Sequence, residues 1–226
     1  MLRTGLIIVG AYLGAALFAP PPFHTLPFQG KPGQGSDLAR RVTSAPDGLV
    51  KMTYAARDGI CGDGKSFIAD ASTAGRGYDV WFSEGNFSTT SSMSGFESRC
   101  TRGPVRLLLV VRDHRVVDVQ PFVGPSSAAT ERAGTELGTV SVNDVSRYLL
   151  DLAAAGREDV ARTAILAASI ADSVRIAGRL ADIARNKSLG SSVRESALKW
   201  VGRVGAREGD RDAMRVARTI AEDRQD

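Results

Sequence analysis

The chain contains 226 residues, with 29 lysines and arginines against 25 aspartates and glutamates and a formal net charge of +4. The two signs of charge are interspersed along the chain without a basic block, a pattern that argues against a nucleic-acid partner. The two cysteines and two histidines are too few for a four-ligand zinc site, so we predict no metal and no cofactor.

The N-terminal segment predicts where the protein works. Residues 1–19 carry a single charge, Arg3, and an uninterrupted run of apolar and small residues covers 5–19. This run has the length of the hydrophobic region of a secretion signal and is shorter than the ~20 residues of a membrane-spanning helix. We expect 1–19 to be an export signal or an uncleaved N-terminal anchor, and 20–44, which begins rich in Pro and Gly, to be a tether. The protein is then exported, to the periplasm or the extracellular space.

Cys61 and Cys100 are the only cysteines, and in an exported protein such a pair is typical of a disulfide. Closing a loop between cysteines this far apart would raise the free energy of unfolding by about 4 kcal/mol. The segment between them is crowded with Gly, Ser and Thr and has few large apolar side chains, so a covalent link has a structural use. The alternative makes Cys61 a nucleophile with His114 as its base, but no Cys-His signature surrounds them.

Residues 59–66 read GICGDGKS and match the P-loop pattern G-x-x-x-x-G-K-[ST] of nucleotide-binding proteins. In such a site a lysine reaches the terminal phosphates, a serine binds magnesium, and an acid at the end of an apolar strand supports the metal. The residues of this alternative nucleotide site are Gly59, Gly64, Lys65, Ser66 and Asp113.

The surroundings of 59–66 argue against nucleotide binding. A P-loop must open a helix whose N-terminus faces the phosphates, yet Gly75 and Gly77 leave at most two helical turns after Ser66. No alternation of strands and helices follows, so the parallel sheet of a P-loop protein cannot form. We predict instead a turn over 62–64 beside a structural cysteine, with Lys65 in solvent.

Up to about residue 135 the hydrophobic pattern is that of β-strands. Over 49–55 apolar and polar residues alternate with a period of two, which is typical of a half-buried strand. Two β-branched runs are joined by residues 112–114, which predicts a hairpin with His114 exposed at its tip. The predicted strands are 49–55, 78–83, 105–111 and 115–120. Together they predict a small antiparallel β module over 45–135, clamped by the disulfide.

From Ser141 the composition shifts to Ala, Leu, Val and Arg, and the apolar period changes to 3.6. Ser192 followed by Glu195 predicts a capping box at the start of the fourth helix. The predicted helices are one from 142 to near 156, one over 158–171, one starting at 173, one starting at 192, and one over 212–222. Short connections force consecutive helices to lie antiparallel, so the helical domain over 141–226 is an α-solenoid or, alternatively, a closed bundle.

Residues 176–204 resemble a HEAT repeat, with two apolar helices around a short polar turn and a Val-Arg-x-x-Ala sequence in the second helix. The HEAT-like core residues are Leu180, Ile183, Val193, Arg194, Ala197, Trp200 and Val201. In HEAT proteins an arginine at the place of Arg194 commonly packs across the turn between repeats. The resemblance therefore implies a partner for Arg194, and Asp182 is the candidate.

More broadly, 50–204 resemble exported bacterial HEAT-repeat-domain proteins of unassigned activity. The shared features are the Ile-Cys-Gly-Asp-Gly turn over 60–64, a Cys-x-x-Gly-Pro-Val segment over 100–105 before a strand hairpin, and Leu-Gly-Thr-Val over 137–140. The resemblance also implies the Cys61–Cys100 pairing. In related sequences the turn need not continue into Lys-Ser, which favours an accidental P-loop match.

These patterns predict an α+β fold in which an antiparallel β module precedes an antiparallel HEAT-like solenoid. The predicted function is an exported, non-enzymatic interaction module that binds a protein or peptide along its helical surface, and meets the membrane only through an N-terminal anchor. Three alternatives remain: the P-loop nucleotide-binding protein, a redox-responsive regulator, and a hydrolase. The hydrolase would use scattered carboxylates such as Asp63, Asp79 and Glu84, although the sequence shows no paired acids.

Overall fold

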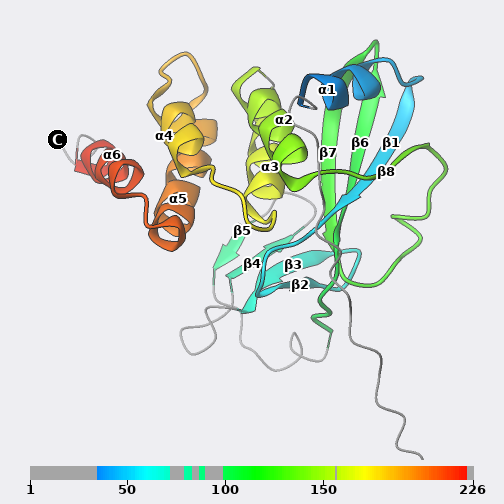
Figure 1. Ribbon diagram of the computed structural model, residues 1–226, viewed down its shortest axis with the longest axis horizontal. Coiled ribbons are helices and arrows are strands. Elements are labelled where there is room, and N and C mark those ends of the chain that lie inside the picture. Colours follow the sequence, from blue (N-terminus) through cyan, green and yellow to red (C-terminus); the bar gives the residue numbers. More distant parts are fainter. Residues whose placement is uncertain (1–34, 72–78, 83–86, 90–98, 156, 223–226) are drawn as a thin grey trace, which may run out of the picture.

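Eight strands and six helices are found in the residues that the computed structural model describes, which are 35–71, 79–82, 87–89, 99–155 and 157–222 (Figure 1). The strands are β1 (Gly48–Tyr54), β2 (Ile60–Gly62), β3 (Phe67–Asp70), β4 (Asp79–Phe82), β5 (Phe87–Thr89), β6 (Val105–Arg112), β7 (Arg115–Val123) and β8 (Thr135–Thr139). The helices are α1 (Gly35–Thr43), α2 (Val142–Ala155), α3 (Glu158–Ser169), α4 (Ala177–Arg185), α5 (Ser191–Glu208) and α6 (Arg211–Glu222).

The larger sheet has the strand order β7-β6-β1-β8. The predicted strand over 49–55 and the predicted hairpin are confirmed as β1 and β6–β7, which pair antiparallel with β6 in the centre. The edge strand β8 runs parallel to β1, so the prediction of a wholly antiparallel module is wrong here. The reason is the long connection after β7, which crosses the sheet to the far side of β1. β8 then runs in the same direction as β7, and β7 and β1 are themselves parallel because each is antiparallel to β6.

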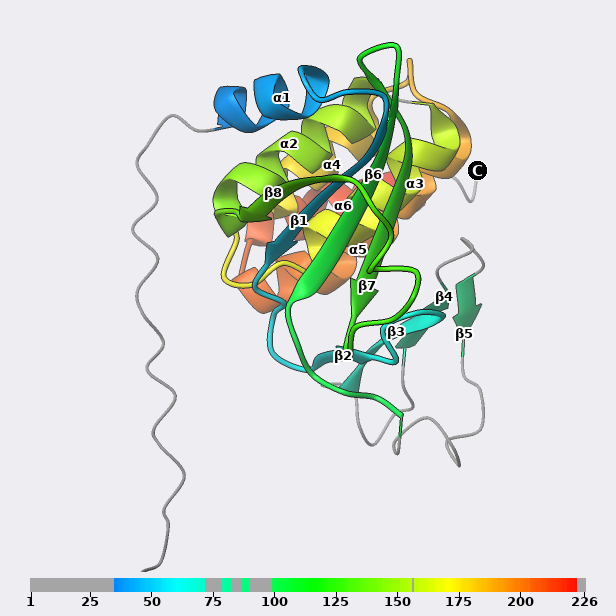
Figure 2. The same cartoon turned by 90° about the vertical axis from the view of Figure 1, so that its right-hand side faces the viewer.

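β6 is apolar along most of its length because both of its faces are covered. Leu107 and Leu109 lie in the main core with no exposed surface, and Leu108, on the opposite face, is 1% exposed. Helices cover the first face (Figure 2), and there the Tyr54 hydroxyl donates a 2.8 Å hydrogen bond to the carbonyl oxygen of Ala167 in α3. On the second face Arg132 donates a 2.7 Å hydrogen bond to the side chain of Gln120, the residue that pairs with Leu108, so the segment after β7 returns over this face.

The smaller sheet, β2-β3-β4-β5, is antiparallel throughout. The predicted disulfide between Cys61 and Cys100 is confirmed, with a Cα–Cα distance of 5.1 Å. Beside it Gly62 and Thr101 exchange two backbone hydrogen bonds of 3.0 and 2.9 Å. The disulfide therefore ties β2 to the segment that leads into β6. The strand predicted over 78–83 is present as β4, whereas β2, β3 and β5 were not predicted.

A buried ion pair joins the smaller sheet to the helices. The Arg57 guanidinium lies 2.7 Å from the carboxylate of Asp70 at the end of β3, and the two side chains are 6% and 9% exposed. The backbone N–H of Arg57 donates to the carbonyl oxygen of Ile170, just after α3, at 2.9 Å. Because a buried charge is costly without a partner, this pair fixes the smaller sheet against the end of α3.

The helices after β8 stack one after another away from the larger sheet (Figure 1). α2 packs on α3, α4 on α5 and α5 on α6, while α3 also contacts α5 and α4 contacts both α2 and α6. α2, α4 and α6 thus form one layer, and α3 and α5 form another. Small buried residues such as Ala161, Ala164 and Ala168 of α3 allow these helices to approach closely. In the part of the chain that the structure describes, no helix combines the length and hydrophobicity needed to cross a membrane.

The two units predicted over 45–135 and 141–226 share one hydrophobic core. Val50 and Met52 of β1 belong to the same buried cluster as Leu149 of α2 and continue into the later helices. β8 also crosses the predicted boundary at residue 135, because it completes the sheet before α2 begins.

The predicted tether over 20–44 is wrong over 35–43, where α1 forms. Leu38 and Val42 lie one turn apart on α1, and both are buried where this helix packs on α2. The Pro- and Gly-rich composition just before α1 hides this short amphipathic stretch. The predicted signal or anchor over 1–19, and the tether up to residue 34, lie outside the described residues.

One predicted capping box and one predicted helix start are also wrong. α5 begins at Ser191 with Gly190 as its N-cap and no side-chain capping hydrogen bond, so the predicted capping box does not form. Ser192 is the second residue of α5, and its hydroxyl donates to the Glu158 carboxylate of α3 instead. α4 begins at Ala177 rather than at 173, because Ser173 has a φ of +50°, which no right-handed helix accepts.

Candidate functional site

The P-loop-like residues 59–66 form a strand and a turn. β2 ends at Gly62, and β3 begins at Phe67, immediately after Ser66. A strand therefore stands where a P-loop protein has the helix whose N-terminus binds phosphate.

Close packing explains the glycines of this turn. Gly64 has a φ of +76°, and a Cβ at this position would lie 1.9 Å from the carbonyl oxygen of Pro125. A Cβ on Gly62 would lie 2.6 Å from the carbonyl oxygens of both Phe67 and Val123. The glycines of the motif thus serve the contact between the β2–β3 turn and the end of β7.

The Asp63 carboxylate organises the turn itself. It accepts hydrogen bonds from the backbone N–H groups of Lys65, Ser66 and Phe67 at 3.0, 2.8 and 3.1 Å, and a further one from the Ser66 hydroxyl. Partial burial raises the pKa of Asp63, but these hydrogen bonds outweigh it and hold the pKa below its ordinary value of 3.8. The serine that would bind magnesium in a P-loop is therefore engaged by the turn.

Asp113, the proposed metal support, lies at the wrong end of the β6–β7 hairpin. It occupies the hairpin turn, where its backbone N–H donates to the Asp47 carboxylate at 3.0 Å. The Gly64 N–H donates at 2.7 Å to the carbonyl oxygen of Val123, which pairs with Val105 at the opposite end. The length of β6 therefore separates Asp113 from Lys65, and the alternative nucleotide site is not assembled.

The Cys61–His114 alternative is likewise not assembled. Cys61 is bonded to Cys100 and lies in β2. His114 is exposed at the hairpin tip, as predicted, with Nδ1 at 2.9 Å from the carbonyl oxygen of Thr43. Among the described residues no group of three or more His, Cys, Asp or Glu side chains is placed to hold a metal ion.

The predicted HEAT-like core residues lie between α4 and α5. The buried ones are Leu180, Ile183, Val193, Ala197, Trp200 and Val201. The guanidinium of Arg203 lies over the Trp200 ring, 5.4 Å from its centroid, which adds a cation–π contact to the burial of the indole. The apolar stripes read from the sequence are therefore the faces that these two helices bury.

Arg194 does not pair with Asp182. The Asp182 carboxylate instead contacts Arg185 at 2.7 Å, in the same helix, because residues three apart share one helix face. Arg194 is half-buried at the start of α5, and its Nε has no hydrogen-bond partner within the described part of the chain.

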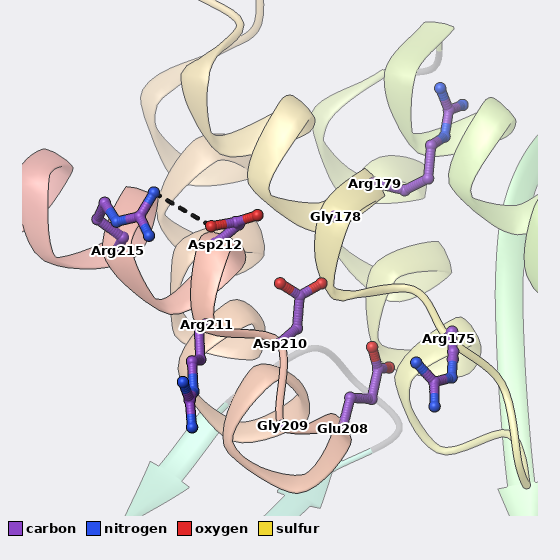
Figure 3. Close-up of a pocket in the computed structure, with 9 residues that line it drawn as sticks. All are labelled: Arg175, Gly178, Arg179, Glu208, Gly209, Asp210, Arg211, Asp212 and Arg215. Carbon is purple, nitrogen blue, oxygen red and sulfur yellow. Dashed lines mark ion pairs between the residues drawn. The ribbon is translucent and has the colours of Figure 1, made fainter.

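Two pockets lie along α4 and α6, one at each end, and Arg215 lines both. The first, which we call the polar pocket, has a volume of about 710 Å³ and lies where α4 and α6 begin and α5 ends (Figure 3). Its lining consists of Arg175, Gly178, Arg179, Glu208, Gly209, Asp210, Arg211, Asp212 and Arg215.

The acids of the polar pocket are engaged in structural contacts. Glu208 accepts the backbone N–H groups of Ile176 and Ala177 at 2.9 and 3.3 Å and so caps α4. Asp210 accepts the N–H of Ala213 at 2.9 Å and so caps α6. Both carboxylates point into the space between the helices in Figure 3. A carboxylate at a helix N-terminus is favourable because it meets unpaired N–H groups and the positive end of the helix dipole.

The second pocket, which we call the cationic pocket, has a volume of about 520 Å³ and lies where α4 ends, α5 begins and the second half of α6 passes. Its lining consists of Ala184, Arg185, Lys187, Arg194, Arg215, Val216, Thr219 and Ile220. Four of these eight residues are cationic, and no described acidic residue lines the pocket. The cationic pocket is thus the candidate binding site on the helical surface.

The sequence alone did not predict either pocket, because each lining comes from three separate helices. One signal was present. Arg185 and Arg215 each have an aspartate three residues before them, whereas Lys187 and Arg194 have no acid three or four residues away. Cations without a local partner of this kind are free to meet an acid from elsewhere.

Comparison of the chain with protein-family models, with curated proteins and with solved structures finds no match in any of the three. The resemblance of 176–204 to a HEAT repeat therefore stays a prediction. The geometry of the helices and of their two pockets is the remaining guide to function.

Proposed function

We propose that the protein is an exported, non-enzymatic interaction module that binds a protein or peptide partner along its helical surface. In this proposal the helices form a short HEAT-like array, with α2, α4 and α6 as one side. The observation that carries the proposal is the pair of pockets along α4 and α6, because pockets between packed helices are a usual place for recognition.

The layered packing of the helices supports this choice of surface. α2 and α4 are linked across the layer by an ion pair between Asp151 and Arg179, at 2.5 Å. α6 follows as the last described helix and contributes most of its length to the two pockets. A row of helices held side by side offers an extended surface that a partner can follow.

Export is supported by two independent features. The Cys61–Cys100 disulfide is of the kind that persists in oxidising compartments. Residues 1–19 have the pattern of a secretion signal or anchor. The alternative nucleotide-binding function has no such support, since Ser66 is engaged by Asp63 in the β2–β3 turn and Asp113 lies in the distant β6–β7 turn.

Site-specific photo-crosslinking in producing cells tests the proposal. A photoreactive amino acid replaces Arg147 of α2 or Thr219 of α6, both exposed, and a control replaces Glu131, exposed on the far side of the larger sheet. We expect the two helix positions to crosslink to the same partner and the control position to give no such product. Crosslinks from Glu131 alone, or none from either helix position, would contradict the proposal.

A further inference from the structure

We infer that the cationic pocket binds an acidic amphipathic peptide segment, with carboxylates against Lys187 and Arg194 and an apolar side chain on the floor formed by Val216 and Ile220. This inference rests on the proposed function and names the chemistry of the partner. Its first support is the contrast between the two pockets.

The contrast is one of charge. In the polar pocket three acids accompany four arginines, and these acids cap helices or pair with Arg215. In the cationic pocket Arg185 and Arg215 have partners, Asp182 and Asp212, that lie outside the lining. Lys187 and Arg194 form no ion pair with any described residue. The pocket therefore carries positive charge that an acidic ligand would complement.

Arg194 is the strongest determinant. It is half-buried, and its Nε is shielded from solvent without an acceptor among the described residues. A buried donor without an acceptor is unfavourable, and a hydrogen bond to a charged acceptor is stronger than one to a neutral acceptor. Arg194 also lines the pocket, and its planar guanidinium matches a carboxylate ligand.

The floor of the pocket selects an amphipathic ligand. Ala184 is 2% exposed, and Val216 and Ile220 are half-buried on the face of α6 that packs on the core. An apolar side chain placed on them would bury further apolar surface, which favours binding. A free carboxylate or phosphate would leave this floor uncovered, so the geometry favours a peptide that carries both kinds of group.

The size and lining of the pocket favour a short segment over a nucleic acid or a membrane. About 520 Å³ accommodates a few side chains. The described lining has no aromatic side chain on which a base could stack. Its apolar residues lie between helices rather than on a protruding apolar face, as membrane insertion would need.

Fluorescence anisotropy with the full chain tests the inference. The probe is a labelled helical peptide with leucines at i and i+4 and glutamates beside them, and its matched control carries glutamines in place of the glutamates. We expect the glutamate peptide to bind more tightly, with the affinity falling as salt is raised. Arg194→Gln should weaken its binding about tenfold, the loss of one charged hydrogen-bonding partner.

Two further variants distinguish a loss of peptide binding from a loss of folding. Lys187 lies in an exposed turn, so Lys187→Gln should leave the fold intact and weaken binding about threefold. Arg162→Gln removes an exposed cation of α3 that lines neither pocket, and it should leave the affinity unchanged. Equal binding of the glutamine peptide, or equal losses for Arg162→Gln and Lys187→Gln, would overturn the inference. Binding to anionic phospholipid vesicles in place of the peptide, lost in Lys187→Gln, would overturn it as well.

Failure of this inference can be told apart from failure of the proposed function. If Thr219 crosslinks to a partner in cells but the glutamate peptide does not bind, the helical surface is a binding surface for another chemistry. If neither helix position crosslinks, the proposed function itself fails.

Discussion

The two sheets of this protein are held in different ways. The larger sheet shares one continuous apolar core with the helices, from Val50 of β1 to Ala213 of α6. In the described part of the smaller sheet Ile60 and Ile68 join this core, and the only separate buried cluster is Cys61, Phe67 and Ala69. A disulfide, a buried ion pair and a hydrogen-bonded turn supplement burial there. Burial therefore dominates in one region, and specific links add to a smaller buried contribution in the other.

The largest effect should come from removing the covalent link. Replacing both Cys61 and Cys100 by serine should lower the free energy of unfolding by about 4 kcal/mol, because the unfolded chain regains the entropy of an open loop. Amide hydrogen exchange should show lost protection in β2 and β3 and retained protection in α2 and α3. Equal loss in both regions would show that the two sheets do not differ as described.

A cavity in the helical core should lower protection in the helices rather than in the smaller sheet. Leu180 has no exposed surface, and Leu180→Ala should lower the free energy of unfolding by about 3 kcal/mol through lost burial and a residual cavity. Equilibrium denaturation measures the loss, and hydrogen exchange should place it in α4 and α5. Met214→Ala, at a partly exposed site on α6, is the matched control and should change stability by less than about 1 kcal/mol.

A smaller effect is expected at the end of the helical layer. Glu208→Ala removes the acceptor for two N–H groups at the start of α4, and it should cost about 1 kcal/mol. Glu222→Ala, at the exposed end of α6, serves as the control. Thermal unfolding of the two variants compares them directly. Equal melting temperatures would mean that Glu208 does not cap α4.

The smallest effect is a change in acid sensitivity at the smaller sheet. The folded pKa of Asp63 lies below its ordinary value of 3.8, so its contribution to stability is complete above that value and is lost as the pH falls through the folded pKa. Asp63→Asn should therefore flatten the dependence of stability on pH below about 4. Denaturation at pH 3 and pH 6 tests this, with Asp58→Asn as an exposed control. An unchanged pH dependence would contradict the role given to the turn.

The same contrast explains what the sequence could predict. The β6–β7 hairpin and the buried stripes of α4 and α5 follow from apolar periods that run over many residues. β2 and β3 span three and four residues, too short for a period to show. α1 is stabilised by packing on α2, a contact between residues about a hundred positions apart. Short elements are thus hard to predict from the sequence, because tertiary contacts rather than a local pattern stabilise them.

The candidate site was predictable only in outline. The helical surface as a whole followed from the composition after Ser141, but the cationic pocket depends on how the end of α4 meets the second half of α6. The P-loop match shows the converse. Gly64 and Ser66 fit the motif letter by letter, yet the glycine serves close packing and the serine belongs to a turn organised by Asp63. A short motif has meaning only in its structural context.

The central claim is that the protein works in an oxidising compartment with its smaller sheet covalently closed. Intact mass spectrometry of the native protein, alkylated without reductant, tests this most directly. We expect a mass lower by two hydrogens than that of the reduced chain and no alkylation of Cys61 or Cys100. Alkylation of both cysteines in native material would contradict export and would reopen the question of what the GICGDGKS turn does.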